Sequence, residues 1–335
     1  MAGAVLVAAG LAVAPACIAQ SSLPPANLEQ FARPASIPAP PGNRLTRAKI
    51  DLGRRLFNDP FLSESGARAC ASCHYPIQSF TDGLQKARAF GRQLQRNTPG
   101  LWNLAWSKAL MRDGRAASLE AQARVPLAAP DEMGGSLEEA VQRIAARPGY
   151  QDGFALAFPD APQISTENLL GALASYERSL VSPQTRFDLW IGGDAAAMTG
   201  PETEGFALFT GKADCIACHG GFAFSDGGFH GIGAQDADPG RAAVTLQNAD
   251  MHAFRTSSLR ELAYTAPYLH DGSAATLAQA LSAHGGAAAR GVAQLSEAER
   301  TAVIAFLAAL SSAGPPVAAP PLDDAGTIVS HVTLE

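Results

Sequence analysis

Four of the five cysteines form two copies of one short motif, in which two thiols three positions apart are followed directly by a histidine. The first copy is Cys70-Ala-Ser-Cys73-His74, and the second is Cys215-Ile-Ala-Cys218-His219. This spacing is typical of covalent haem attachment, because both thiols can reach the vinyl groups of one porphyrin while the histidine binds its iron. The repeated motif predicts two c-type haems.

Two other chemistries use paired cysteines. A zinc ion could be held by both pairs together, and two tight disulfides could form in an oxidising compartment. Zinc-binding pairs usually lie about 15–20 residues apart, and neither alternative accounts for a histidine after each pair. Haem attachment is therefore the favoured interpretation.

The two haems are expected to differ in their second axial ligand. No histidine lies between residues 75 and 218, so the first haem has no local imidazole for its open side. Met111, Met133 and Met198 are expected to pack in core or loop rather than to bind iron. The first iron would then be free to bind peroxide. The second haem has several histidines downstream and can be six-coordinate, which suits an electron relay.

The segments around the two motifs also repeat. Gly53-Arg-Arg-Leu-Phe precedes the first motif, and Gly205-Phe-Ala-Leu-Phe precedes the second. Phe80-Thr-Asp-Gly and Phe224-Ser-Asp-Gly follow them. A short helix, a haem motif and a turn thus recur in the same order, which predicts two similar domains that arose by internal duplication.

Helical patterns dominate the rest of the chain. Ser296 with Glu299 and Ser136 with Glu139 are capping boxes, and an apolar face predicts a further helix over 168–180. No alternating apolar run is long enough to predict a sheet. The expected fold class is mostly α, with two cytochrome-c-like haem domains, long loops, and little or no sheet.

Composition limits the class of protein. The chain has 335 residues, of which 47% are hydrophobic and 17% charged. This length suggests two domains, and a charged fraction below the usual value of about 25% excludes wholesale disorder. The net charge of -6 argues against a nucleic-acid partner.

The ends of the chain predict export. Residues 1–19 are interpreted as a signal peptide, although no Lys or Arg precedes its apolar run, and this run is too short for a membrane span of about 20 residues. Cleavage after Ala19 would release a periplasmic protein, and a lipid anchor on Cys17 is the less favoured alternative.

Residues 20–42 are expected to be a Pro-rich linker or arm. They precede an N-terminal, peroxide-reactive haem domain (43–195), a C-terminal, electron-relay haem domain (196–313) and a tail (314–335).

Residues 52–310 resemble the bacterial di-haem cytochrome c peroxidases and their MauG-like relatives. Besides the two haem motifs, the matching strings are Gly53-Arg-Arg-Leu-Phe-Asn-Asp-Pro60, Phe80-Thr-Asp-Gly83, Arg96-Asn-Thr-Pro99, Asp113-Gly-Arg115, Ser118-Leu-Glu-Ala-Gln122, Pro130-Asp-Glu-Met133 and Thr265-Ala-Pro-Tyr-Leu-His-Asp-Gly272.

The resemblance implies roles for individual residues. His74 would bind the iron of the peroxide-reactive haem, and His219 that of the relay haem. Gln122 and Glu132 match the distal-pocket pair of the family. Glu132 would move a proton from the inner to the outer peroxide oxygen, and Gln122 would hold the peroxide by a hydrogen bond.

The resemblance also implies further metal ligands. Asn97, with the backbone oxygens of Thr265 and Pro267, matches a calcium site between the haems, and oxygen ligation suits this hard cation. The second axial ligand of the relay haem lies 17 positions beyond Pro267 in the family, which is His284 here. Cytochrome-oxidising members have Met at this position and MauG-like members Tyr or another residue, so a histidine resembles the MbnH-type branch. A histidine at a helix end with no ligand role is the alternative.

One position departs from the family pattern. A tryptophan that serves as a stepping stone for electrons usually precedes Asp-Gly-Arg, but here the residue is Arg112, whose guanidinium cannot be oxidised at these potentials. Electrons would then pass through Trp106 or directly between the haem edges, or exchange between the haems would be slow.

The favoured function is a periplasmic di-haem peroxidase. Hydrogen peroxide would be cleaved at a five-coordinate N-terminal haem, and electrons would arrive through a six-coordinate C-terminal haem. The missing distal histidine and His284 favour MauG-like oxidation of a partner protein. The alternatives are a peroxidase that draws electrons from a small cytochrome c or cupredoxin, and a di-haem electron carrier without catalysis.

Overall fold

A computed structural model describes residues 28–233, 236–285 and 289–314 of the chain. The predicted signal peptide, the alternative anchor residue Cys17 and the tail from residue 315 lie outside these ranges. The fold is mostly helical, as predicted. The α-helices are α1 (Arg47–Phe57), α2 (Leu119–Ala128), α3 (Leu137–Ala145), α4 (Tyr150–Ala157), α5 (Thr166–Ser179), α6 (Arg186–Ile191), α7 (Gly200–Thr210), α8 (Ala242–Thr245), α9 (Leu277–Ser282), α10 (Ala289–Ala293) and α11 (Glu297–Ala309).

Short 3-10 helices and two small sheets fill the long loops between the α-helices. Strands β1 (Arg88–Ala89) and β2 (Arg92–Gln93) pair antiparallel, as do β3 (Phe229–His230) and β4 (Phe254–Arg255). The 3-10 helices are η1 (Leu28–Phe31), η2 (Pro41–Asn43), η3 (Pro60–Leu62), η4 (Cys70–Ser72), η5 (Pro76–Gln78), η6 (Leu104–Trp106), η7 (Cys215–Ala217), η8 (Asn248–Asp250) and η9 (Leu262–Tyr264).

The predicted capping boxes do begin helices. The Ser136 hydroxyl accepts a hydrogen bond from the Glu139 backbone N–H at the start of α3, and Ser296 caps α11 through Glu299 in the same way. The helix predicted over 168–180 is α5, which starts two residues earlier because Ser165 caps it. These local signals were sufficient because each needs only residues within one turn.

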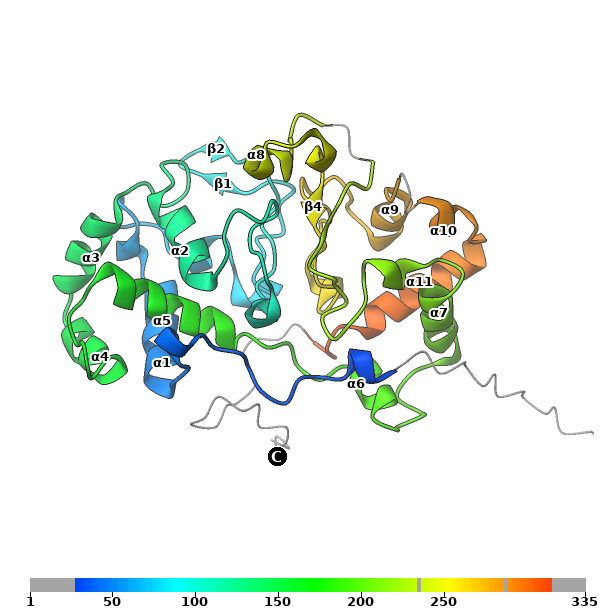
Figure 1. The fold of residues 1–335 in the computed structure, drawn as a ribbon, viewed down its shortest axis with the longest axis horizontal. Helices are drawn as coiled ribbons and strands as arrows, with labels where there is room; N and C mark the ends of the chain where they lie inside the picture. The colour runs from blue at the N-terminus through cyan, green and yellow to red at the C-terminus, as the bar shows by residue number, and fades with distance from the viewer. Residues whose placement is uncertain (1–27, 234–235, 286–288, 315–335) are drawn as a thin grey trace, which may run out of the picture.

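Two hydrophobic cores divide the molecule into two halves (Figure 1). The first half contains α1–α5, and Phe57, Phe154 and Leu173 are among the side chains of its core. The second contains α7 and α9–α11, with Phe206 and Phe306 in its core. Each core packs against the helix that precedes one haem motif.

The repeated glycines explain how these helices pack. Helix α1 packs on α5, and α7 packs on α11. A Cβ atom at Gly53 would overlap the backbone carbonyl of Ala172, and one at Gly205 would overlap that of Ala302. Glycine therefore occurs at the same place before both motifs because the helix backbones approach too closely for a side chain.

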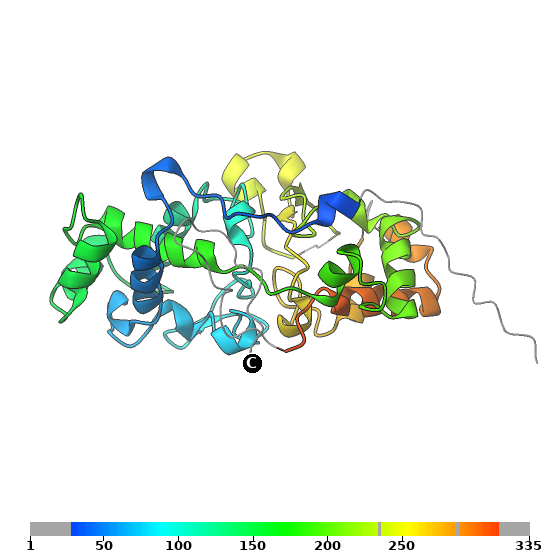
Figure 2. The same ribbon diagram turned by 90° about the horizontal axis from the view of Figure 1, so that it is seen from below.

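Two segments cross between the halves. Figure 2 shows the arm of residues 28–46 and the segment after α5 both running from one half to the other. Residues 20–42 are expected to form a linker or arm rather than core, which is wrong for Phe31: its side chain is fully buried in the second core and stacks on Phe224 at 5.0 Å. That core also includes Phe187, which precedes the expected boundary at 195–196. The domain boundary itself stays a prediction.

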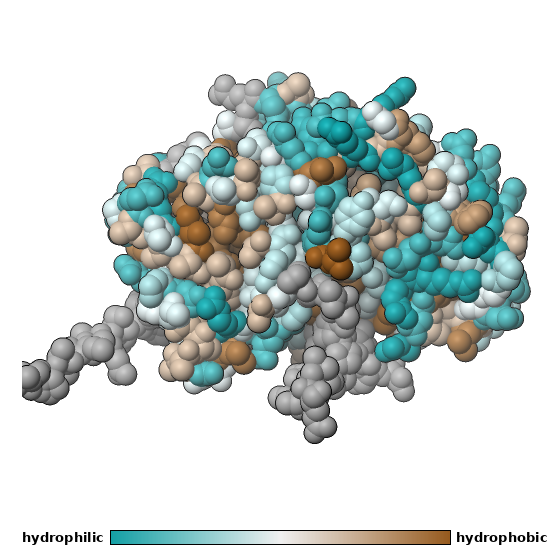
Figure 3. All heavy atoms as spheres, turned by 180° about the vertical axis from the view of Figure 1, so that it is seen from behind, coloured by the Kyte–Doolittle hydropathy of each residue, from teal (hydrophilic) through white to brown (hydrophobic). Residues whose placement is uncertain are grey.

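The surface differs between the two halves. In Figure 3, which shows the molecule from behind, hydrophobic residues gather over the half that contains α7 and α11, whereas hydrophilic residues cover more of the other half. Within the described ranges, no helix has the length and apolar character needed to cross a membrane.

Candidate active site

The first motif holds its histidine in one tautomer. Cys70–Ser72 form η4, and the His74 backbone N–H donates to the Cys70 carbonyl at 2.9 Å. The His74 Nδ1 atom donates to the Phe80 carbonyl at 2.8 Å. This bond leaves Nε2 as the atom available to a metal, the usual arrangement for a metal-binding histidine. A cavity of about 650 Å³ opens beside Cys73.

The second motif repeats this arrangement. Cys215–Ala217 form η7, and the His219 backbone N–H donates to the Cys215 carbonyl at 2.8 Å. The His219 Nδ1 atom donates to the Phe224 carbonyl at 3.0 Å. The residue that follows each motif thus orients the histidine through its backbone carbonyl, while its phenyl ring is buried in the core of the same half.

The alternatives to haem do not fit the four cysteines. All four are free thiols, so no disulfide joins them within the described ranges. Cys70 packs against the first core and Cys215 against the second, so the two pairs cannot share one zinc ion. Burial raises the pKa of Cys70 to about 12 and that of Cys215 to about 11, so both thiols are protonated when nothing is bound to them.

A second histidine stands opposite His219. The His219 and His284 ring centroids are 6.4 Å apart, and the His284 Nδ1 atom donates to the Ala280 carbonyl at 2.8 Å. A histidine nitrogen lies about 2 Å from its metal, so two rings on opposite sides of one ion have centroids about 6 Å apart. Burial, with His284 adding to it, lowers the pKa of His219 to about 4 and keeps it neutral. The pair therefore fits a bis-histidine haem.

The expected peroxide-handling residues lie in the first half. Burial raises the pKa values of Cys70 and Cys73, and nearby acidic residues raise them further. Glu132 is one of these acids for both thiols, so its charge lies within range of the first motif. Burial also raises the pKa of Glu132 above its usual range, with Asp131 adding to the effect. Gln122 lies on α2, and its Oε1 atom is buried with no hydrogen-bond partner among the described residues. An unpaired buried acceptor of this kind fits a site built to hold a further group.

Similarity to known proteins agrees with this geometry. The family model described as "Di-haem cytochrome c peroxidase" matches residues 47–196. The methylamine utilization protein MauG of Methylorubrum extorquens is 43% identical over 321 residues, which are 92% of this chain and 91% of that protein. The chain belongs to the di-haem cytochrome c peroxidase family. It is a peroxidase.

Two further relatives represent different branches of the family. The cytochrome c551 peroxidase of Nitrosomonas europaea is 36% identical over 244 residues, 70% of this chain and 72% of that protein. The crystal structure of a MauG-like protein associated with microbial copper homeostasis has 30% identity and a TM-score of 0.77, and it covers 87% of this chain and 96% of that one. The chain is thus similar in sequence to a cytochrome c peroxidase and in both sequence and fold to a MauG-like protein.

One buried acid of this peroxidase escaped the sequence analysis. Glu177 on α5 is 5% exposed, and its Oε2 atom has no hydrogen-bond partner among the described residues. Burial raises the pKa of Glu177 to about 8, and its charge acts on Cys70. The sequence does contain a feature that indicates this buried acid. Glu177 lies four residues after Leu173, on the buried face of an amphipathic helix, where a charged residue is unusual.

The three methionines lie where they were expected, and His270 lies in a loop. Met133 and Met198 are buried in the two cores, and Met111 packs against a smaller cluster. His270 stacks on Phe254 with ring centroids 3.8 Å apart, and its Nε2 atom lies 2.6 Å from Asp236 Oδ2. This histidine braces a loop of the second half.

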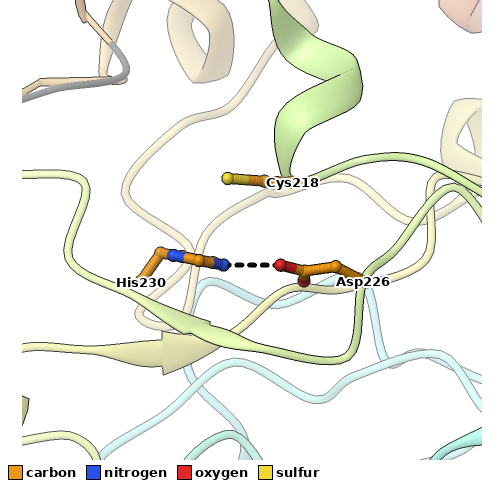
Figure 4. Close-up of side chains that lie close together, drawn as sticks. All are labelled: Cys218, Asp226 and His230. Atoms are coloured by element: carbon orange, nitrogen blue, oxygen red, sulfur yellow. Dashed lines mark hydrogen bonds and ion pairs between the residues drawn. The ribbon is translucent and has the colours of Figure 1, made fainter.

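A cluster at the edge of the second motif contains Cys218, Asp226 and His230 (Figure 4). The His230 Nε2 atom lies 2.7 Å from Asp226 Oδ2, and the Cys218 thiol is near both. Cys218 is also one of the two thiols of the second motif, so this cluster shares a ligand with the predicted haem attachment.

The junction of the two halves contains Trp106 and Arg112. The Trp106 ring packs edge-on against Phe222, three residues after His219, with centroids 5.2 Å apart.

Arg112 Nη2 donates to Asn97 Oδ1 at 3.1 Å, the oxygen on which the expected calcium site depends. The residues around Asn97 therefore do not fit a calcium ion, because a guanidinium already occupies its side-chain ligand.

Proposed function

We propose that this peroxidase carries two covalently attached c-type haems of unequal coordination. Cys70, Cys73 and His74 would hold the first, and Cys215, Cys218 and His219 the second, with His284 as its second axial ligand. The spacing of His219 and His284 supports this proposal most directly, because two imidazoles on opposite sides of one iron would lie at about this separation. Calcium is not part of the proposed cofactor set.

The residues around the first haem would perform the acid–base work of peroxide cleavage. A bound haem supplies an iron that takes the oxidant and exchanges electrons. Glu132 is half-buried, and its charge acts on both thiols of the first motif; it is the base that would accept the proton of hydrogen peroxide and return it to the outer oxygen. Gln122 would orient the peroxide through its side-chain amide, since its buried Oε1 has no hydrogen-bond partner in the described part of the chain. The Phe80 carbonyl keeps His74 in the metal-binding tautomer.

The electrons would come from a partner protein in the periplasm, in a MauG-like reaction. The similarity to MauG over 92% of the chain and the histidine at position 284 support this branch. The similarity to a cytochrome c551 peroxidase supports the second candidate, in which a small cytochrome c or cupredoxin is the donor. The apolar N-terminal run supports export.

Peroxide added to the fully oxidised holoprotein tests this function. We expect a rapid change of the Soret spectrum without prior reduction, because the first haem is open to the oxidant. A matched sample reduced first with one electron per chain should react no faster. A reaction that occurs only after reduction would favour the cytochrome-oxidising branch. An oxidised protein that is entirely low-spin and inert to peroxide would mean an electron carrier.

Replacement of His284 tests the second site separately. In the His284→Ala holoprotein, the relay haem should lose its low-spin EPR signal and become high-spin or water-ligated, while haem content stays at two per chain. His252→Ala is the matched control, because this histidine also lies in the second half but its Nδ1 donates to the Asp238 carbonyl. A low-spin signal that survives His284→Ala would assign the ligand to another residue.

A further inference from the structure

Arg112 joins the two halves of the molecule through its backbone and its side chain. Its carbonyl accepts a hydrogen bond from the Arg255 backbone N–H at 2.8 Å. Its Nη1 atom donates to Ser257 Oγ at 2.8 Å, and its Nη2 atom donates to Asn97 Oδ1 at 3.1 Å. The guanidinium therefore bridges Asn97 of the first half and Ser257 of the second.

The charge of Arg112 has no hydrogen-bonded counter-ion among the described residues. Both of its acceptors are neutral, and its Nε atom is buried without a partner there. Burial, followed by the charges of Arg255 and Arg96, lowers the pKa of Arg112 to about 10 against a smaller opposite effect of Asp271, so the side chain stays protonated at neutral pH. The junction thus contains a full positive charge before any ion binds.

The orientation of Asn97 is fixed by the same network. Its backbone N–H donates to the His270 carbonyl at 2.8 Å, and its Nδ2 atom donates to the Leu84 carbonyl at 2.9 Å. Because the amide nitrogen is used in this way, Oδ1 must face Arg112. A calcium ion on Oδ1 would lie next to the guanidinium, and at a buried place solvent and salt screen this repulsion poorly.

We propose that Arg112 takes the place of a bound calcium ion in this protein. Its guanidinium is the fixed cation on Asn97 Oδ1 that connects the two halves, and the holoprotein binds no calcium at this junction. The residue that replaces the usual tryptophan thus also removes the need for the metal.

Calcium itself is the probe that tests the wild-type protein. The holoprotein with both haems is passed through gel filtration in calcium-containing buffer, and its metal content is measured by mass spectrometry. We expect far less than one calcium per chain, no one-to-one binding in calorimetric titration with CaCl2, and a melting temperature that a chelator does not change. One retained calcium per chain, or one-to-one binding with a Kd below about 1 mM, would overturn the proposal.

Variants test whether Arg112 is the cause. Arg112→Gln removes the charge and leaves Oδ1 accessible, so it should bind calcium one-to-one at least tenfold more tightly than the wild type and melt at a higher temperature with CaCl2 than with MgCl2. Arg112→Lys retains the charge and should bind none, and adding Asn97→Ala to Arg112→Gln should abolish the gained binding. Calcium binding by Arg112→Lys, or no gain in Arg112→Gln, contradicts the proposal. If Arg112→Gln does not fold, calcium binding by the wild type and by Arg112→Lys still tests the proposal, because either result would contradict it. None of these readouts depends on peroxide, so their failure leaves the proposed function intact.

Discussion

Replacement of Glu132 by Gln is expected to lower the second-order rate of reaction with hydrogen peroxide by about a hundredfold or more, with haem content unchanged. General acid–base catalysis typically contributes factors of about 10²–10⁴. Glutamine preserves the size of the side chain but cannot accept the proton, so the loss reports proton transfer rather than packing. Stopped-flow absorbance at the Soret band measures this rate.

The pH dependence of the same rate gives a second check. Burial raises the pKa of Glu132, and the residue acts as a base only when ionised. The wild-type rate should therefore fall as the pH is lowered through this raised pKa, at a higher pH than for an ordinary glutamate. In Glu132→Gln, the rate of reaction with peroxide should not show this fall at low pH.

Glu138→Gln is the matched control, because Glu138 is exposed on α3 and loses the same charge. Its rate and pH profile should equal those of the wild type. An unchanged peroxide rate in Glu132→Gln would remove Glu132 from the proposed mechanism.

Replacement of Asp188 by Ala is expected to destabilise the holoprotein by about 3–5 kcal/mol, the range measured when one partner of a buried ion pair is removed. The Asp188 side chain is 2% exposed and accepts hydrogen bonds from Arg260 at 2.8 and 2.9 Å and from Arg33 at 3.3 Å. Its loss would leave the buried guanidinium of Arg260 and the partly buried guanidinium of Arg33 without their carboxylate.

This ion pair also supports the second haem motif. Arg260 Nε donates to the Phe222 carbonyl at 2.7 Å, and its guanidinium lies over the Phe222 ring at 4.6 Å. Asp188→Ala should therefore loosen the loop after His219 as well as lower the free energy of unfolding. Denaturant titration, followed by both far-UV circular dichroism and the Soret band, separates the two effects.

Asp51→Ala is the control for an ion pair at the surface. Asp51 is paired with Arg47 at 3.0 Å, but its side chain is 43% exposed, so its removal should cost less than about 1 kcal/mol. A loss at Asp188 as small as that at Asp51 would show that the buried network does not hold the arm and loop together.

Much of the fold could be predicted because its signals are local. The capping boxes at Ser136 and Ser296 and the periodic apolar face of α5 involve residues three or four positions apart, and each of them formed a helix. Phe31 could not be placed in this way. It lies in a Pro-rich stretch and is buried only because its partners Phe187 and Phe224 come from distant parts of the chain.

The haem chemistry was determined by the sequence alone, because the two thiols and the histidine of each motif are adjacent in the chain and need no distant residue to be recognised. Only the tertiary structure decided what surrounds them. It placed His284 opposite His219, buried Glu177 near Cys70, and set Arg112 on Asn97 Oδ1. These contacts join residues between 15 and 107 positions apart, so packing rather than local pattern creates them.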